Sequence, residues 1–244
     1  CQFLQKQAVR RLAEILPLNA EYHGEKQAEF YQDIAKQLLI YVNNYHQNHH
    51  VTAHGKHISV GLIRMANIQP LMQIAQAIYQ LTDFENQQDT HFYLCCYHSQ
   101  QVLALRNRLE NRLDKVLTRK NVSAEDFIKR GDIAQAIAKN PSKTNHIFIV
   151  LATPVTEVGR DHDYDWAMVE PSSMRSIIQL AGRVWRHRSE LVANTPNMGI
   201  WQYNIRALKS RVQSNGNHAV FAQPGFESKQ YLLDTHDMKQ LIDE

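Results

Sequence analysis

The sequence predicts a doubly wound α/β domain, with a mostly parallel, RecA-like sheet flanked by helices, over residues 58–210. Two observations predict this fold class. Apolar runs such as residues 146–153 (HIFIVLAT) are nearly continuous, which is typical of strands covered on both faces. Segments with helical spacing of apolar residues alternate with these runs, and such alternation connects parallel strands. We expect a helical segment before this domain and a less regular tail after it.

The part before the α/β domain is expected to be helical. Apolar residues recur at helical spacing over residues 2–17 and 25–45. Residues 46–57 (HQNHHVTAHGKH) are polar and rich in histidine, and they predict a loop. Because Cys1 opens the chain inside a predicted helix, we expect the chain to be a fragment of a longer polypeptide. The sequence leaves open whether this part packs on the α/β domain or on a neighbouring domain.

Strands and helices then follow one another along the chain. Pro70 suits the first turn of a helix, and Ser123 with Asp126 three residues later is a helix-capping pattern. The predicted strands cover residues 58–68, 91–97, 146–153, 166–170 and 198–208. The predicted helices cover residues 70–81, 101–119, 123–140 and 173–188, the last capped by Ser172 or Ser173. The expected division is a helical segment with its histidine-rich loop over 1–57, the α/β domain over 58–210 and a tail over 211–244.

Composition excludes several classes of protein. Hydrophobic residues make up 43% and charged residues 21%, as in ordinary globular domains. No apolar stretch approaches the roughly 18 residues that cross a bilayer, and no signal peptide opens the chain, so we expect no membrane partner. Three cysteines, two of them adjacent in an apolar run at Cys95 and Cys96, do not form a disulfide framework, which favours the cytoplasm. The net charge of +3 is compatible with a polyanionic partner without defining one.

Ligands of parallel sheets bind beyond the carboxyl ends of the strands, which directs attention to the residues after Tyr97, Ala152 and Glu170. Residues 153–161 hold hydroxyl, glycine and carboxylate groups suited to a phosphate and a ribose. The alternative is a polar turn that only reverses the chain. Residues 161–165 (DHDYD) begin like a calcium loop, but that loop needs glycine and glutamate at positions where tryptophan and serine stand here, so calcium is excluded.

The predicted helix over residues 173–188 carries an apolar stripe and an unusual opposite face. A glycine in a helix interior costs about 1 kcal/mol relative to alanine, which favours a surface that a ligand or another domain approaches closely. Arginine rather than lysine fits bidentate contact with phosphate oxygens. The alternative is a solvated helix face. The residues on this face are Arg175, Gln179, Gly182, Arg183 and Arg186.

The order of these motifs resembles a known family. A strand ending in Thr-Pro-x-Thr-Glu-x-Gly-x-Asp, then another strand, then a helix with Gln-x-x-Gly-Arg-x-x-Arg resemble motifs V and VI in the second RecA-like domain of a superfamily 2 helicase. More narrowly, residues 151–188 are similar to the helicase-nuclease of type I CRISPR systems, and most similar to the I-F form. Residues 61–71 (GLIRMANIQPL) and 94–101 (LCCYHSQQ) resemble the opening strand and motif IV region. The resemblance covers residues 58–210 and extends more loosely into the tail.

The resemblance implies an ATP site shared with another domain. It makes Arg186 the arginine finger on the γ-phosphate, with Arg183 beside it on the phosphates, and Gln179 orienting the nucleotide or its attacking water. It also implies that Gly159 and Asp161 lie at the ATP cleft, Asp161 toward the ribose, and that Gly182 permits close approach.

The resemblance also implies contacts with the backbone of a tracked DNA strand. These contacts would come from Thr153 and Thr156, with His98 and Ser99 as further candidates. Leu180 stands where the commonest helicase motif has arginine, so the resemblance assigns it no role. Trp185 replaces a small residue, and its partner is not evident from the sequence.

Several parts of a complete enzyme are missing from the sequence. No G-x-x-x-x-G-K-[ST] phosphate loop, no Asp-Glu-x-His and no nuclease His–Asp set occur; the dipeptides at 162–163 and 236–237 lack companion histidines. We therefore expect ATP with Mg²⁺ to be bound mainly by a missing first RecA-like domain, and a nuclease metal to lie in another missing domain. The fragment alone is expected to be inactive. No metal site is assigned in this chain, because the histidines over 46–57 have no fixed ligand spacing.

The family implies partners that the residues alone do not. They are single-stranded DNA, followed in the 3′→5′ direction, and the crRNA-guided surveillance complex that marks the target. The adaptation integrase and phage-encoded inhibitor proteins are further expected partners. Two alternatives stay open: a non-catalytic RecA-like module that binds a protein partner through its basic face, and half of an RNA helicase. The basic helix over 101–119 is expected to be a solvated face.

Overall fold

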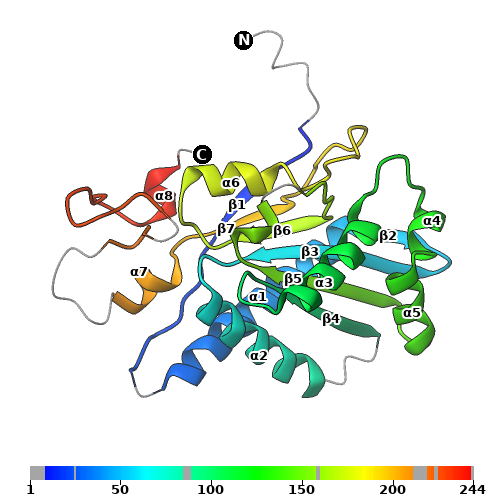
Figure 1. The fold of residues 1–244 in the computed structure, drawn as a ribbon, viewed down its shortest axis with the longest axis horizontal. Coiled ribbons are helices and arrows are strands. Elements are labelled where there is room, and N and C mark those ends of the chain that lie inside the picture. Colours follow the sequence, from blue (N-terminus) through cyan, green and yellow to red (C-terminus); the bar gives the residue numbers. More distant parts are fainter. Residues whose placement is uncertain are drawn as a thin grey trace, which may run out of the picture.

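The computed structural model describes residues 9–24, 26–84, 89–157, 160–210, 219–222 and 225–242. Within this part of the chain, one sheet of seven strands forms the centre of the molecule (Figure 1). The strands are β1 (Ala13–Leu16), β2 (Val51–Ala53), β3 (Lys56–Arg64), β4 (Thr90–Tyr97), β5 (Asn145–Ala152), β6 (Trp166–Val169) and β7 (Met198–Trp201).

The sheet has the order β1-β7-β6-β3-β5-β4, and every neighbouring pair in this series is parallel. Strand β2 forms an antiparallel hairpin with β3 through a turn at His54 and Gly55, both at positive φ. Strand order departs from chain order on both sides of β3, as in doubly wound sheets. The predicted fold class, α/β with a mostly parallel sheet, is confirmed.

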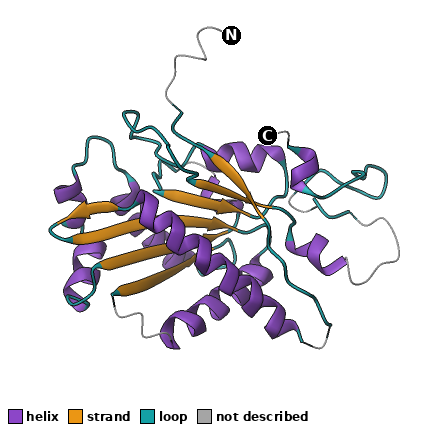
Figure 2. Cartoon of the chain, turned by 180° about the vertical axis from the view of Figure 1, so that it is seen from behind, coloured by secondary structure: helices purple, strands orange, loops and turns teal. Residues whose placement is uncertain are grey.

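Helices cover both faces of the sheet, as Figures 1 and 2 show from opposite sides. One face packs against α1 and α2, and the other packs against α3 to α6. Alternate strand residues face the two layers: Trp166 and Met168 of β6 face α1 and α2, while Ala167 and Val169 face the other helices. The helices are α1 (Gln27–His49), α2 (Ile68–Phe84), α3 (Leu103–Leu117), α4 (Ala124–Ile128), α5 (Gly131–Lys139), α6 (Met174–Ala181), α7 (Ile205–Ser210) and α8 (Met238–Leu241).

The helix predicted over residues 2–17 is wrong where the structure describes it; residues 1–8 lie outside the described part. Residues 13–16 form strand β1, which pairs with β7 and places Leu16 opposite Trp201. Leu16 is fully buried, so burial at the sheet edge outweighs the helical spacing. Residues 46–49 continue helix α1, and the rest of the predicted histidine-rich loop forms the β2–β3 hairpin. The question left open by the sequence is thereby answered: this segment packs on the α/β domain.

Two other predicted elements divide. The helix over 123–140 becomes α4 and α5, and the strand over 198–208 becomes β7 followed by α7. The strand ends at Trp201, and Asn204 begins α7 because its Oδ1 accepts a hydrogen bond from the Ala207 N–H (2.8 Å), as a helix N-cap does. The tail packs back on the same core through Phe221 and Met238. Among the described residues, no helix is long and apolar enough to cross a membrane.

Candidate functional site

The carboxyl ends of β4 and β5 bring two predicted DNA-contact segments together. Tyr97 and Ala152 are register partners, and the Thr153 N–H donates to the Tyr97 carbonyl (3.2 Å). His98 and Thr153 therefore follow the ends of adjacent strands. The Thr153 side chain is buried in this conformation. His98 is half-buried and its Nδ1 has no partner among the described residues, while Ser99 is exposed.

The rest of the predicted loop is described only in part. Thr156 lies in the short 3-10 helix η2 (Pro154–Glu157). Its side chain and the whole of Gly159 lie outside the described residues, so their roles stay predictions.

Helix α6 ends at Ala181, about two turns earlier than the sequence predicts. Ser173 caps its start, as expected, and accepts a hydrogen bond from the Ser176 N–H (3.2 Å). The helix ends at Ala181, and Gly182 is its C-cap with φ −63°, so the expectation of an interior glycine is wrong. A Cβ at Gly182 would meet the Gln179 and Ile178 carbonyl oxygens at 3.3 and 3.7 Å, so within the described part of this chain no other element approaches this glycine.

Residues 183–188 leave the helix because they bond to the segment after β5. Val184 forms a parallel bridge with Tyr164, and the Trp185 N–H donates to the Tyr164 carbonyl (3.1 Å). Trp185 adopts a left-handed φ of +47°, which turns the chain away from the helix axis. Its ring packs edge-to-face on His49 of α1 at 5.6 Å, which supplies the partner that the sequence left unassigned. Arg11, which precedes β1, donates a hydrogen bond to the Val184 carbonyl (2.9 Å).

This turn exposes one arginine and buries the others. The side chain of Arg186 is 43% exposed, while Arg183 and Arg188 are largely buried. The prediction that Arg183 and Arg186 share a helix face is therefore wrong, since both lie beyond the helix. Leu180 is fully buried in the core, and Gln179 is half-buried on α6.

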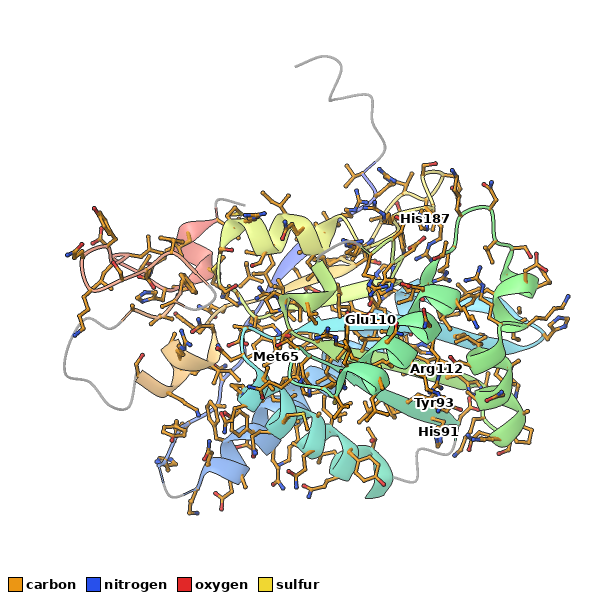
Figure 3. The ribbon with its side chains drawn as sticks, in the orientation of Figure 1. Met65, His91, Tyr93, Glu110, Arg112 and His187 are labelled. Atoms are coloured by element: carbon orange, nitrogen blue, oxygen red, sulfur yellow. The ribbon has the colours of Figure 1, made fainter. Side chains whose placement is uncertain are left out.

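Arg186 meets Asp161, the other residue predicted at the nucleotide. Arg186 Nε donates to Asp161 Oδ1, and His187 Nε2 lies 2.9 Å from Asp161 Oδ2. The pKa of Asp161 lies below its ordinary value, because its carboxylate accepts a hydrogen bond from Arg186 and a second one from His187. Asp161 is 58% exposed, so the pair borders solvent. Its neighbour His187 is labelled in Figure 3.

Behind this pair lies a buried network of two aspartates and two arginines. Arg188 donates to Asp163 and to Asp165, at 2.6 Å in each case, and Arg119 donates to Asp165 (2.8 Å). The second oxygen of Asp165 accepts the Val60 N–H (2.7 Å). Burial by itself would raise the pKa of Asp165, but Arg119 and Arg188 together lower it.

A second set of contacts fastens the loop after η2 to helix α3. Arg160 pairs with Glu110 and with Asp114 (2.8 Å to Asp114 Oδ2), and His162 Nε2 lies 2.8 Å from Asp114 Oδ1. Tyr97 also donates to Glu110 (2.6 Å), which Figure 3 labels on α3. Sequence reasoning missed both sets of contacts. The signal that could have found the buried network is the Asp-x-Asp spacing at 163–165 together with the basic run at 186–188.

Four of the histidines in residues 46–57 take part in hydrogen bonds and ring contacts within the fold. His46 bonds to Ser59 (2.8 Å), His49 to the Pro196 carbonyl (2.7 Å), and the rings of His50 and His57 stack at 4.2 Å. The described ranges contain no group of three or more His, Cys, Asp or Glu residues that could hold a metal ion.

The doubly wound parallel sheet, with the motif residues Asp161 and Arg186 in contact beside it, is the arrangement of a RecA-like helicase domain. Residues 57–189 match the family described as CRISPR-associated nuclease/helicase Cas3, C-terminal, and the chain belongs to this family.

Relatives agree with this assignment, and solved structures share the fold. The chain is 41% identical over 240 residues to the Cas3 subtype I-F/YPEST nuclease/helicase of Pseudomonas aeruginosa, covering 98% of this chain and 21% of that protein. It is 44% identical over 237 residues to the Pectobacterium atrosepticum protein of the same description, covering 96% and 20%. The chain thus spans about a fifth of these relatives. Crystal structures of T. fusca Cas3, alone (TM-score 0.52, 14% identity, 84% of this chain, 20% of that chain) and with AMPPNP (0.50, 13%, 85%, 20%), share its fold.

Proposed function

We propose that the chain is the second motor domain of an ATP-dependent, 3′→5′ single-stranded DNA translocase of type I CRISPR interference, and that it is inactive alone. The observation that carries the proposal is the meeting of Asp161 and Arg186. Motif positions 25 residues apart, assigned to the ribose and to the γ-phosphate, lie in contact on the side of the sheet where the strands begin, near the end of α3 and the residues before β1.

Because this pair is exposed, Arg186 can exchange its contact with Asp161 for a contact with a phosphate. An ion pair between exposed side chains stabilises by about 1 kcal/mol or less, so Arg186 leaves Asp161 at low cost. A phosphate oxygen offers the guanidinium a stronger, charge-assisted contact. Arg188 reaches a ligand only if the buried network breaks, and Arg183 is also buried, which supports Arg186 as the finger.

Other residues keep the roles that the family suggests, as parts of the same proposal. Gln179 and Gly182 flank the nucleotide near Arg186, with Arg183 next to the phosphates and Gly159 at the cleft. The DNA backbone contacts come from Thr153, Thr156, His98 and Ser99, which follow adjacent strands at one edge.

ATP with Mg²⁺ is bound mainly by the first RecA-like domain of the intact protein. The absence of a phosphate loop in the sequence supports this division, as does the AMPPNP described with T. fusca Cas3. The proposed partners are single-stranded DNA, the crRNA-guided surveillance complex, the adaptation integrase and phage-encoded inhibitors. The proposed place of action is the cytoplasm, and the nuclease metal belongs to another domain.

Phosphate release from ATP by the parent polypeptide, with Mg²⁺ and single-stranded DNA, tests the proposal. Arg186→Ala is expected to lower DNA-stimulated turnover about 10³-fold or more with DNA binding retained. Arg186→Lys should recover little, because lysine lacks the planar fork. Arg112→Ala is the matched control, since Arg112 pairs with Asp132 at the surface.

Three outcomes would change the conclusion. Turnover that survives Arg186→Ala would favour the non-catalytic binding module. Equal stimulation by RNA would favour the RNA helicase. Hydrolysis by the 244-residue chain alone would show that it contains a complete site.

A further inference from the structure

His187 connects the core of the domain to the exposed Asp161. Its side chain is 9% exposed, and its two ring nitrogens face different partners. The backbone N–H of Arg119 donates to Nδ1 (3.2 Å), while Nε2 lies 2.9 Å from Asp161 Oδ2. Because Nδ1 accepts a hydrogen bond, the proton of the neutral ring is on Nε2, and the ring donates it to Asp161.

The buried network holds this ring in place. The His187 N–H donates to Asp163 Oδ2 (3.1 Å), and Arg188 and Arg119 in turn hold Asp163 and Asp165. The ring is therefore fixed by its own backbone, by the Arg119 N–H and by the positive-φ turn at Trp185 before it.

Asp161 has no comparable support of its own. It lies on a solvent-exposed loop, and a carboxylate there loses rotamer freedom only through its partners. Within the described part of the chain, its carboxylate contacts Arg186 through Oδ1 and His187 through Oδ2. When Arg186 moves to a phosphate, the hydrogen bond from His187 is the contact that still orients the Asp161 carboxylate.

We infer that His187 is a positioning residue, which holds the Asp161 carboxylate so that its other oxygen faces Arg186 before ATP binds and a ribose hydroxyl afterwards. This inference rests on the proposed function, because it assigns Asp161 to the ribose and Arg186 to the γ-phosphate. It adds a link between the folded core and the nucleotide that the helicase motifs do not contain.

Two substitutions of the same residue separate this role from a structural one. The amide nitrogen of His187→Gln reaches the position of Nε2 and keeps the donor to Asp161. The shorter amide of His187→Asn reaches only the position of Nδ1, so it keeps the Arg119 contact and loses Asp161. In the parent polypeptide, with single-stranded DNA, we expect kcat/KM for ATP to fall about tenfold in His187→Asn and to stay within about twofold in His187→Gln.

The role through Asp161 is tested by non-additivity. His187→Asn should have little further effect in an Asp161→Ala background. Asp161→Glu changes an exposed site that tolerates substitution and moves the carboxylate by one methylene away from the ring. Its kcat/KM for ATP should fall as much as that of His187→Asn. This variant tests the inference even if His187→Asn fails to fold.

The inference is overturned if Asn and Gln variants fall together, if the effects of His187→Asn and Asp161→Ala multiply, or if Asp161→Glu keeps wild-type kcat/KM. Failure of the proposed function is recognised separately, because Arg186→Ala would then leave turnover unchanged. Loss of turnover in Arg186→Ala with wild-type behaviour of His187→Asn would overturn the role of His187 alone.

Discussion

Replacing Asp165 by asparagine removes one charge from a balanced, buried set. Asp163 and Asp165 oppose Arg119 and Arg188, and both aspartate side chains are fully buried. In Asp165→Asn the remaining charges no longer cancel, and an excess positive charge stays in the interior. Both oxygens of Asp165 accept hydrogen bonds, one from the Val60 N–H and the other from the two guanidinium groups. In asparagine an NH₂ group replaces one of these oxygens, so one donor would face another donor.

The expected cost follows from the burial of these groups. Breaking a buried ion pair by removing one partner destabilises a protein by about 3–5 kcal/mol. For a urea m-value of about 3 kcal/mol/M, the unfolding midpoint should fall by about 1 M or more. Tryptophan fluorescence of the 244-residue chain in urea measures this, because its tryptophans, Trp166, Trp185 and Trp201, are all buried.

Two controls make the measurement decisive. Asp132→Asn removes the partner of Arg112 in an exposed pair and should cost about 1 kcal/mol or less. Adding Arg119→Met to Asp165→Asn restores the charge balance and should recover part of the lost stability. An Asp165→Asn chain as stable as Asp132→Asn would refute the argument from buried charge.

Two further predictions concern packing and pH. Gly61→Ala should cost about 1–3 kcal/mol in the same urea titration, because a Cβ there would lie 2.1 Å from the buried Trp166 ring; Gly131→Ala, with nothing within 4 Å, should be nearly neutral. The folded pKa of Asp165 lies below its unfolded value, so its contribution to stability is present above about pH 4 and is lost as pH falls through the lower folded pKa. Asp165→Asn should accordingly lose less stability than wild type between pH 5 and pH 3, and equal acid sensitivity of both chains would contradict this.

Local patterns in the sequence were sufficient for most of the α/β domain. The apolar runs at β3 to β6 and the helical spacing of α1 to α3 and α5 are properties of short segments, so they could be predicted without knowledge of the fold. The placement of His98 and Thr153 at one edge also follows, because parallel strands end on the same side, whereas Asp161 lies on the side where the strands begin.

The turn that carries Arg186 could not be predicted in this way. The sequence spacing favours a helix to residue 188, but Arg188 bonds to Asp163, which is 25 residues away in the chain. The gain from pairing these buried charges, together with the bridge between Val184 and Tyr164, exceeds the gain from continuing the helix to residue 188.

The sequence by itself determined the class of the sheet, the order of its motifs and the residue types at its carboxyl edge, since periodicity and composition are local. The tertiary structure decided that residues 13–16 are a strand, that α6 ends at Ala181 and that His187 joins Asp161 to the core. These features depend on contacts between distant segments, and their free energies arise only when the chain has brought those segments together.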